Sequence, residues 1–254
     1  MLIDVVPFFN EKEILKLRFE ELYDIVDKFV IVENDHSFRG LYKGYNFEKL
    51  QDYFKPYLDK VEYVKCSLVG HEDLHKNYAM NSKTLQNLTN DDYVMFGDVD
   101  EIPKHDCVKY ALSIIKYNYK TIIFDGSMYL YRLNGLVKDF VWSGTILFNS
   151  ELLKNNTLTY IRDHIRPLNN HEHWHFNDSS WHFTTIGTYE QIFDKLTNWG
   201  HWSEIDNISL SVIKSLVEKG EHFHPNCKNL KIEYTNIEDL PKGVSQFDYL
   251  LKEF

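Results

Sequence analysis

Three carboxylates within four positions form the stretch of this sequence that is best suited to chemistry. The segment from Tyr93 to Pro103 begins as an apolar run and ends in Asp98, Asp100 and Glu101. On an extended chain, side chains two residues apart point to the same side, so the carboxylates of Asp98 and Asp100 would lie close together and repel each other. A hard divalent cation such as Mn²⁺ or Mg²⁺ suits such oxygen ligands and commonly completes its shell with substrate phosphates. The motif therefore predicts a metal site for a diphosphate, and the alternative is an acidic strand end with no ligand.

The segments before this motif alternate between strand and helix patterns. Such alternation predicts an α/β fold with a mixed, mainly parallel sheet flanked by helices. In open sheets of this kind, ligands bind outside the carboxyl ends of the strands, which is where the acidic motif falls. The expected strands are 2–6, 29–32, 61–64 and 93–97, and the expected helices are 11–23, 76–88 and 108–117.

The pattern changes after Lys120, where strands follow one another with few helices between them. We expect strands at 121–124, 128–131, 145–148 and 180–186, and helices at 189–199 and 209–219. No low-complexity linker separates the two parts, so the chain is interpreted as one domain, 1–254. Residues 1–118 would form its nucleotide-binding half and residues 119–254 its acceptor-side half.

Composition and net charge limit the kinds of ligand that this chain can bind. The 254 residues are 43% hydrophobic and 26% charged, which is typical of a globular protein. A net charge of −10 argues against nonspecific binding of nucleic acid, which needs a basic surface. It also means that an anionic substrate needs a metal ion or a local cluster of arginines and lysines.

Localisation is expected to be cytoplasmic. The first seven residues lack the basic region of a signal peptide and are too short for a membrane anchor, so no membrane span is expected. Cys66, Cys107 and Cys227 form neither a zinc pattern nor an obvious disulfide set, which favours a reducing compartment.

Four blocks in a fixed order resemble glycosyltransferase family 17. This is the family of the β-1,4-mannosyl-glycoprotein N-acetylglucosaminyltransferase that adds the bisecting residue to N-glycans. The resemblance implies a GT-A-type (Rossmann-like) fold, a UDP-sugar donor carrying N-acetylglucosamine, a glycan or glycoprotein acceptor, a Mn²⁺ or Mg²⁺ ion, and inversion at the anomeric carbon. The four blocks are Pro7–Glu11, Glu21–Glu33, Asp98–Pro103 and Trp181–Phe183.

The resemblance also implies a set of metal ligands. In GT-A enzymes a later histidine often completes the metal site, and His182 is the candidate beside Asp98 and Asp100. The alternative for His182 is a hydrogen-bonded histidine of the core.

Donor-binding residues are expected at the ends of the first strands and in one arginine pair. Glu33 ends the second strand, where such folds contact the nucleoside, and the alternative is a solvated strand end. Arg162 and Arg166 are four apart and suit bidentate binding of a diphosphate, with a surface role as the alternative. The remaining candidates lie in and beside the first loop, with Asp98 of the acidic motif: Pro7, Phe8, Asn10, Glu11 and Asp98.

An inverting reaction needs a general base that deprotonates the acceptor hydroxyl. Glu101 beside the metal pair, Glu204 after His201, and Asp178 are the candidates. The sequence does not choose among them.

A second motif suggests a different enzyme class. Residues His171 to His175 satisfy H-E-x-x-H, the zinc-protease signature, which requires a helix so that both histidines share a face. Helix-breaking residues flank it on both sides, so we expect an exposed or acceptor-side loop, with a zinc metallopeptidase as the alternative.

Two further alternatives concern the acidic motif and the fold. Haloacid-dehalogenase phosphatases share an Asp-x-Asp motif, but there Thr or Val stands where this chain has Ile102. A non-catalytic sugar-binding protein of the same fold is the other alternative, and the intact acidic residues count against it.

Overall fold

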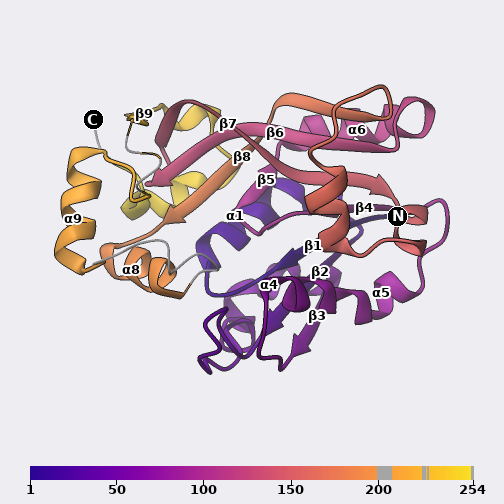
Figure 1. The fold of residues 1–254 in the computed structure, drawn as a ribbon, viewed down its shortest axis with the longest axis horizontal. Coiled ribbons are helices and arrows are strands. Elements are labelled where there is room, and N and C mark those ends of the chain that lie inside the picture. Colours follow the sequence, from indigo (N-terminus) through magenta and orange to yellow (C-terminus); the bar gives the residue numbers. More distant parts are fainter. Residues whose placement is uncertain (199–207, 225–226, 228, 253–254) are drawn as a thin grey trace.

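A single sheet of mixed strand direction runs through the molecule (Figure 1). The computed structural model describes residues 1–198, 208–224, 227 and 229–252. Within these residues the strand order is β3-β2-β1-β4-β7-β6-β8-β5, and β9 pairs with β7.

The first half of the chain forms the parallel part of the sheet. β1 lies between β2 and β4, and β3 pairs with the outer side of β2, all in parallel register. β1, β2 and β4 are nearly continuous runs of apolar residues because both of their faces are covered, whereas the edge strand β3 is only partly buried. Their bounds are Leu2–Pro7 (β1), Lys28–Asn34 (β2), Val61–Cys66 (β3) and Tyr93–Phe96 (β4).

The second half continues the same sheet through an antiparallel junction between β4 and β7. β6 pairs antiparallel with β7 and parallel with β8, and the short β5 pairs antiparallel with β8. Their bounds are Glu101–Pro103 (β5), Thr121–Tyr131 (β6), Gly135–Asn149 (β7), His173–Ile186 (β8) and Ile232–Tyr234 (β9).

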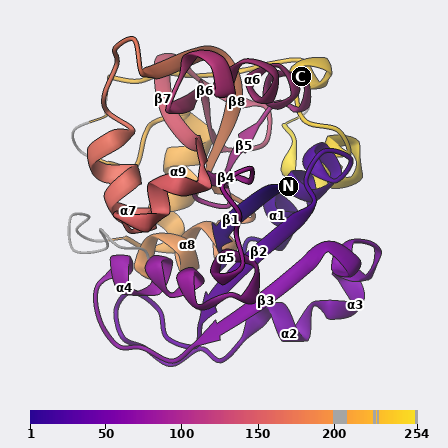
Figure 2. The same cartoon turned by 90° about the vertical axis from the view of Figure 1, so that its right-hand side faces the viewer.

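Helices cover both faces of the sheet. α1 and α6 bury their apolar sides in one core cluster, whereas α5 and α7 contribute to a second cluster on the opposite face. α4 and α7 accordingly lie across the strands from α1 (Figure 2). The helices are Lys12–Leu22 (α1), Asn46–Lys49 (α2), Gln51–Phe54 (α3), Glu72–Asn77 (α4), Lys83–Gln86 (α5), His105–Asn118 (α6), Leu158–Tyr160 (α7), Tyr189–Asn198 (α8) and Leu210–Lys219 (α9).

These elements confirm the predicted α/β class with a mixed sheet flanked by helices. One expected helix, 76–88, is instead broken into α4, a 3-10 turn (Tyr78–Asn81) and α5. The break has a local cause, because the side chain of Ser82 accepts a hydrogen bond from the backbone of Leu85 and starts a new helix. The strand expected at 180–186 is also longer than predicted, because β8 begins at His173.

No helix within the described ranges is long and apolar enough to cross a bilayer. The division of the chain into a nucleotide-binding half and an acceptor-side half stays a prediction.

Candidate functional site

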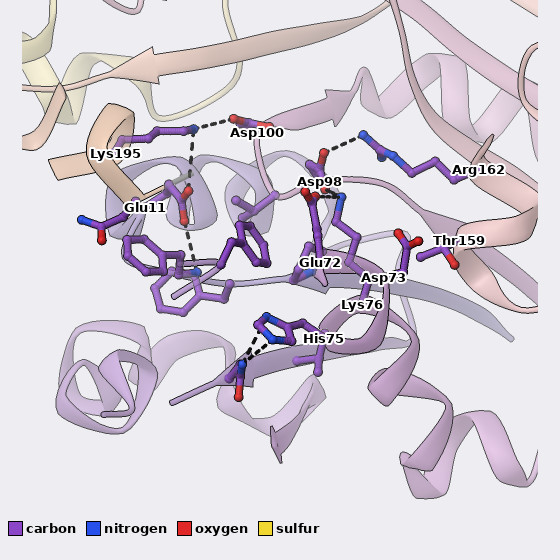
Figure 3. Close-up of a pocket in the computed structure, with 18 of the residues that line it drawn as sticks. Glu11, Glu72, Asp73, His75, Lys76, Asp98, Asp100, Thr159, Arg162 and Lys195 are labelled. Atoms are coloured by element: carbon purple, nitrogen blue, oxygen red, sulfur yellow. Dashed lines mark hydrogen bonds and ion pairs between the residues drawn. The ribbon is translucent and has the colours of Figure 1, made fainter. Parts of the chain in front are cut away.

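A cleft of about 430 Å³ opens at the carboxyl ends of β1, β2 and β4. A volume of this size suits a small ligand. α4, the π-helical turn Ile161–Ile165 and α8 supply the surrounding walls, and Figure 3 shows side chains from these elements pointing into the cleft. The charged residues of the lining are Glu11, Lys43, Glu72, Asp73, Lys76, Asp98, Asp100, Arg162, Asp163, Arg166 and Lys195.

The acidic motif forms a turn rather than a continuation of β4. The strand ends at Phe96, and the backbone N–H of Glu101 donates to the carbonyl oxygen of Asp98 at 3.0 Å. The prediction that Asp98 and Asp100 share one side of an extended chain is therefore wrong. Their carboxylates point to different parts of the cleft and contact different cationic groups (Figure 3).

Gly97 makes this turn possible. A Cβ atom at this position would lie 2.3 Å from the hydroxyl oxygen of Thr145 and 2.8 Å from a carboxylate oxygen of Glu101. Real Cβ atoms do not come so close to other atoms, so the turn packs against β7 only because residue 97 has no side chain.

A buried ion pair supports the turn from below. Arg18 of α1 is fully buried and binds both carboxylate oxygens of Asp4 at 2.7 Å. The same guanidinium donates to the carbonyl oxygens of Asp98 and Glu101, at 3.2 and 2.6 Å. The turn is therefore fixed by a charged group in the core, which is costly to bury unless it is paired in this way.

Asp98 is held by two cations. One carboxylate oxygen lies 2.7 Å from the ammonium group of Lys76, and the other lies 2.5 Å from the guanidinium group of Arg162. Loss of water around the group would raise its pKa, but Arg162 and Lys76 outweigh this and hold the pKa of Asp98 well below its usual range. Both oxygens are thus paired with protein cations, so a metal ion at Asp98 would have to displace Lys76 or Arg162, and the metal-ligand role of Asp98 stays a prediction.

Glu101 is a structural carboxylate. Its side chain is completely buried and accepts hydrogen bonds from the backbone of Asp98, from the indole of Trp142 and from Arg162. Burial would raise the pKa of Glu101, but Arg162 and Arg166 lower it below the ordinary value. A general base needs an accessible lone pair, so the structure contradicts the prediction of Glu101 as the base.

The arginine pair predicted for diphosphate binding does reach the cleft. Both Arg162 and Arg166 line it, and the π-helical turn between them brings them to the same side. Arg162 is buried and committed to Asp98 and Glu101, whereas Arg166 lies 3.5 Å from Glu101 and donates to the carbonyl oxygen of Gly144 at 3.4 Å. Arg166 is therefore the less committed of the two.

Asp100, His182 and Lys195 form a separate group on the other side of the turn. One oxygen of Asp100 lies 3.7 Å from Nε2 of His182, and the other lies 2.8 Å from the ammonium of Lys195. Burial lowers the pKa of His182, and the nearby Asp100 and Glu101 offset this only in part, so the imidazole is neutral at neutral pH. Trp142 stacks on the imidazole with ring centroids 4.6 Å apart, which fixes its orientation.

Asp100 and His182 are chemically suited to a divalent ion. Within the described ranges, no three His, Cys, Asp or Glu side chains are grouped to hold a metal by themselves. Magnesium-like ions, however, commonly use one or two protein carboxylates and take the remaining ligands from substrate phosphates and water. A neutral imidazole beside a carboxylate supplies such a partial set, and Nδ1 of His182 is buried with no hydrogen-bond partner among the described residues.

Glu33 is not a nucleoside ligand in this structure. It is almost completely buried, and its carboxylate accepts hydrogen bonds from Lys43, from the hydroxyl of Tyr63 and from the backbone N–H groups that begin α2. Its task is to cap α2 and tie it to β2 and β3. Its neighbours Val32 and Asn34 line the cleft in its place.

Only some residues of the loop that follows β1 line the cleft. Pro7, Phe8 and Glu11 line the cleft as predicted, whereas Asn10 does not. The side-chain amide of Asn10 instead donates to Asp194 of α8 at 2.7 Å. Asn10 does not cap α1 either, since Glu11 occupies the N-cap position.

The remaining candidate bases are not brought to the cleft. Asp178 is exposed on the surface, pairs with Lys104 at 2.6 Å, and lines a different groove. Glu204 and His201 lie outside the described residues.

The H-E-x-x-H segment is not helical, and it is also not the expected loop. His171 and Glu172 form a turn and β8 begins at His173. His173 pairs with the hydroxyl of Thr121, and His175 pairs with Asp125. The two histidines of the signature therefore do not share a helix face, and the zinc-peptidase alternative is wrong.

Sequence reasoning missed three side chains that line the cleft, Lys76, Lys195 and Trp142, and it missed the supporting Arg18. Arg18 carried a visible signal, because it is a charged residue within the apolar stripe of α1. Lys76 and Lys195 carried no such signal, because each lies on a short helix that contains other polar residues. Only the tertiary fold brings them to the acidic turn.

Comparison with known families gives one match across most of the chain. The sequence model of glycosyltransferase family 17 matches residues 1–224, a range that contains every residue of the cleft named above. No protein of curated function matches the chain.

Several solved structures are similar at low levels. A 4-diphosphocytidyl-2C-methyl-D-erythritol synthase from Anaerococcus prevotii shares 11% identity and has a TM-score of 0.42, over 76% of this chain and 93% of its own. A second structure with the same enzyme name shares 12% identity at a TM-score of 0.42, covering 70% and 89%. A mycobacterial protein shares 13% identity at a TM-score of 0.44, covering 79% and 75%. Likeness at this level says nothing about substrate or reaction.

Proposed function

Since the chain belongs to glycosyltransferase family 17, we propose that its cleft binds a nucleotide-sugar donor and that the sugar is transferred to a glycan acceptor. The observation that carries this proposal is the distribution of charge around the acidic turn. Lys76 and Arg162 lie on one side of the turn, and Lys195 with the Asp100–His182 pair lies on the other. A donor diphosphate fits between groups of this kind.

Cations of the protein supply one of the two sources of positive charge that composition left open for an anionic ligand. With a net charge of −10, such a ligand needs a metal ion or a local cluster of arginines and lysines. Beside six carboxylates, five lysine or arginine side chains line the cleft among the described residues: Lys43, Lys76, Arg162, Arg166 and Lys195. In this proposal, the diphosphate is bound by a metal ion and these cations together.

Asp100 and His182 would hold a Mn²⁺ or Mg²⁺ ion, and such an ion supplies positive charge to the leaving diphosphate. Arg166 is placed to add a bidentate contact, because it is less engaged with protein carboxylates than Arg162. These contacts strengthen as negative charge develops on the leaving group, and this is the kind of interaction that accelerates a reaction.

The nucleoside would bind at the other end of the cleft. Phe38 and His75 stack with ring centroids 5.3 Å apart, and both line the cleft. Asn34 fixes His75 by donating to its ring nitrogen at 2.7 Å. Flat aromatic surfaces next to hydrogen-bonding groups suit a nucleobase. By family, the donor is UDP-N-acetylglucosamine and the acceptor is a glycan or glycoprotein.

Transfer with inversion requires the acceptor oxygen to attack the anomeric carbon from the face opposite the diphosphate. The new C–O bond forms as the bond to the β-phosphate breaks, and its electron pair leaves with the phosphate oxygen. The acceptor proton passes to a general base. Of the three candidates, Glu101 is buried and Asp178 does not line the cleft, and Glu204 stays a candidate from the sequence alone because it lies outside the described residues.

A screen of nucleotide-sugar hydrolysis tests this proposal without knowledge of the acceptor. Purified protein is incubated with a panel of UDP- and GDP-sugars, with Mn²⁺ or with EDTA, and the released nucleotide is measured. We expect release from UDP-N-acetylglucosamine that depends on Mn²⁺. We also expect Asp100→Asn to lower it by about 100-fold, the order of effect for a lost electrostatic stabiliser.

Two outcomes would contradict the proposal. Wild-type turnover by Asp100→Asn at saturating Mn²⁺ would make Asp100 structural. UDP binding without hydrolysis or transfer of any sugar would instead favour the non-catalytic sugar-binding alternative.

A further inference from the structure

Lys195 reaches the acidic turn from the far wall of the cleft. It projects from α8, and its ammonium lies 2.8 Å from Asp100 and 3.6 Å from Glu11 (Figure 3). Its side chain is only 18% exposed. A lysine that is so enclosed loses solvation and rotamer freedom, and its two carboxylate neighbours offset that loss.

Contacts with distant parts of the chain set the position of α8. The amide of Asn10 donates to Asp194 at 2.7 Å, and Arg39 donates to the carbonyl oxygen of Thr197 at 2.9 Å. On its other side, α8 buries Ile192 and Leu196 in a core cluster with residues of β6 and β7. Contacts on both sides of α8 thus fix the position of Lys195 in the cleft, whereas a surface lysine would be free to move.

The two oxygens of Asp100 already face two nitrogen groups. One oxygen lies beside Nε2 of His182 and the other is paired with Lys195. A divalent ion at Asp100 would therefore bring a second positive charge close to the ammonium. Like charges in an enclosed site repel strongly unless an anion lies between them, and a donor diphosphate is such an anion.

We propose that Lys195 is a donor-binding residue that exchanges Asp100 for the diphosphate when the metal ion and donor bind. This inference rests on the proposed function. Lys195 neutralises Asp100 before the ligands bind, and it contacts the phosphate oxygens once the metal ion and the donor are bound. In the transfer step it stabilises the electron pair that moves onto the phosphate oxygen, and it gives up no proton.

The exchange has a consequence that a purely structural lysine does not have. Removal of the ammonium should help a divalent ion to bind alone, because its competitor for Asp100 is gone. The same change should weaken the nucleotide, because one phosphate contact is lost. A lysine that only holds α8 in place would move both affinities in the same direction.

The test compares Lys195→Met and Lys195→Arg with wild type. Mn²⁺ binding without nucleotide is measured by electron paramagnetic resonance, and UDP binding at saturating Mn²⁺ by calorimetry. We expect Lys195→Met to bind Mn²⁺ about tenfold more tightly and UDP about tenfold more weakly, the order of effect of a close charge pair. Lys195→Arg keeps the charge and should recover most of the UDP affinity.

Lys104→Met is the matched control, because Lys104 is also ion-paired but lines a different groove. It should leave both affinities unchanged. Thermal unfolding of each variant shows whether the fold is kept, and Lys195→Arg gives the answer if Lys195→Met unfolds.

Each remaining outcome has a distinct meaning. If wild type binds UDP with Mn²⁺ and Lys195→Met binds both as wild type does, or loses both together, the exchange is refuted while the proposed function stands. If Lys195→Met unfolds and Lys195→Arg binds UDP no better than metal-free wild type, the exchange is likewise refuted. If wild type binds no UDP with Mn²⁺, the proposed function itself fails.

Discussion

Replacement of Glu101 by glutamine should destabilise the fold, because this carboxylate is the buried partner of Arg162. Its two oxygens accept hydrogen bonds from Arg162 at 2.8 and 2.9 Å, and the side chain is completely buried. Removal of one charge from a buried pair costs roughly 3–5 kcal/mol. Because Arg162 keeps its ion pair with Asp98 at 2.5 Å, we expect a loss of unfolding free energy at the lower end of this range, about 3 kcal/mol.

This free energy corresponds to a measurable shift of the melting temperature. For a chain of this size, each kcal/mol is worth about 2–4 °C, so Glu101→Gln should melt about 6–12 °C below wild type. Differential scanning calorimetry near pH 7 measures the shift. Glu172→Gln is the matched control, because Glu172 forms only an exposed pair with Lys120 and should melt close to wild type.

Acidification provides a second test with a defined sign. The fold lowers the pKa of Glu101, so its stabilisation is complete above the unfolded value of about 4.3 and is lost as the pH falls through the folded pKa. The difference between wild type and Glu101→Gln should therefore shrink as the pH falls below about 4. A variant that melts with wild type at pH 7 but has lost turnover would refute this reasoning and return Glu101 to a chemical role.

Three other substitutions test separate parts of the site. His182→Ala should lower metal-dependent donor hydrolysis by about tenfold or more, whereas the exposed His171→Ala should leave it unchanged; normal hydrolysis by the first variant would remove His182 from the metal site. Gly97→Ala should destabilise the protein in thermal melts by about 2 kcal/mol, since its Cβ would lie 2.3 Å from the hydroxyl of Thr145; an unshifted melting temperature would mean that the turn has room to move. Arg18→Met should cost about 3 kcal/mol in urea unfolding by leaving a carboxylate buried without its partner, and a wild-type midpoint would show that the turn needs no support from below.

Strands and the location of the motif could be predicted from the sequence because they depend on local pattern. The apolar run from Tyr93 to Phe96 forms the expected strand, and the acidic residues follow it at the carboxyl edge of the sheet. The family match confirms the family that the ordered blocks suggested. These features are set by residues that lie close together in the chain.

The roles of individual carboxylates could not be predicted, because they depend on partners distant in the sequence. The sequence predicts that Glu33 ends a strand, but in the structure Lys43 and the start of α2 cover its carboxylate. Glu101 reads as a candidate base, but Arg162, sixty-one positions later, neutralises it. Neither partner is visible in a local pattern, so burial and charge pairing emerged only from the fold.

The direction of Asp98 and Asp100 illustrates the same limit on a smaller scale. Their spacing predicts a shared side only if the chain stays extended. The hydrogen bond from Glu101 to Asp98 closes a turn instead, and the supports of that turn lie in α1 and β7. Local spacing identified two residues that do line the cleft, but it predicted the wrong geometry for them.

We propose that Asp100 and His182 hold a divalent ion against a donor diphosphate in this cleft. Anomalous diffraction from crystals grown with UDP and Mn²⁺ tests it most directly, because manganese is located independently of any assumption about the ligand. We predict one manganese peak within bonding distance of Asp100 and His182, with diphosphate oxygens beside it and the nucleobase near Phe38. A manganese peak at another site, or UDP bound outside the cleft, would contradict this assignment of the metal site.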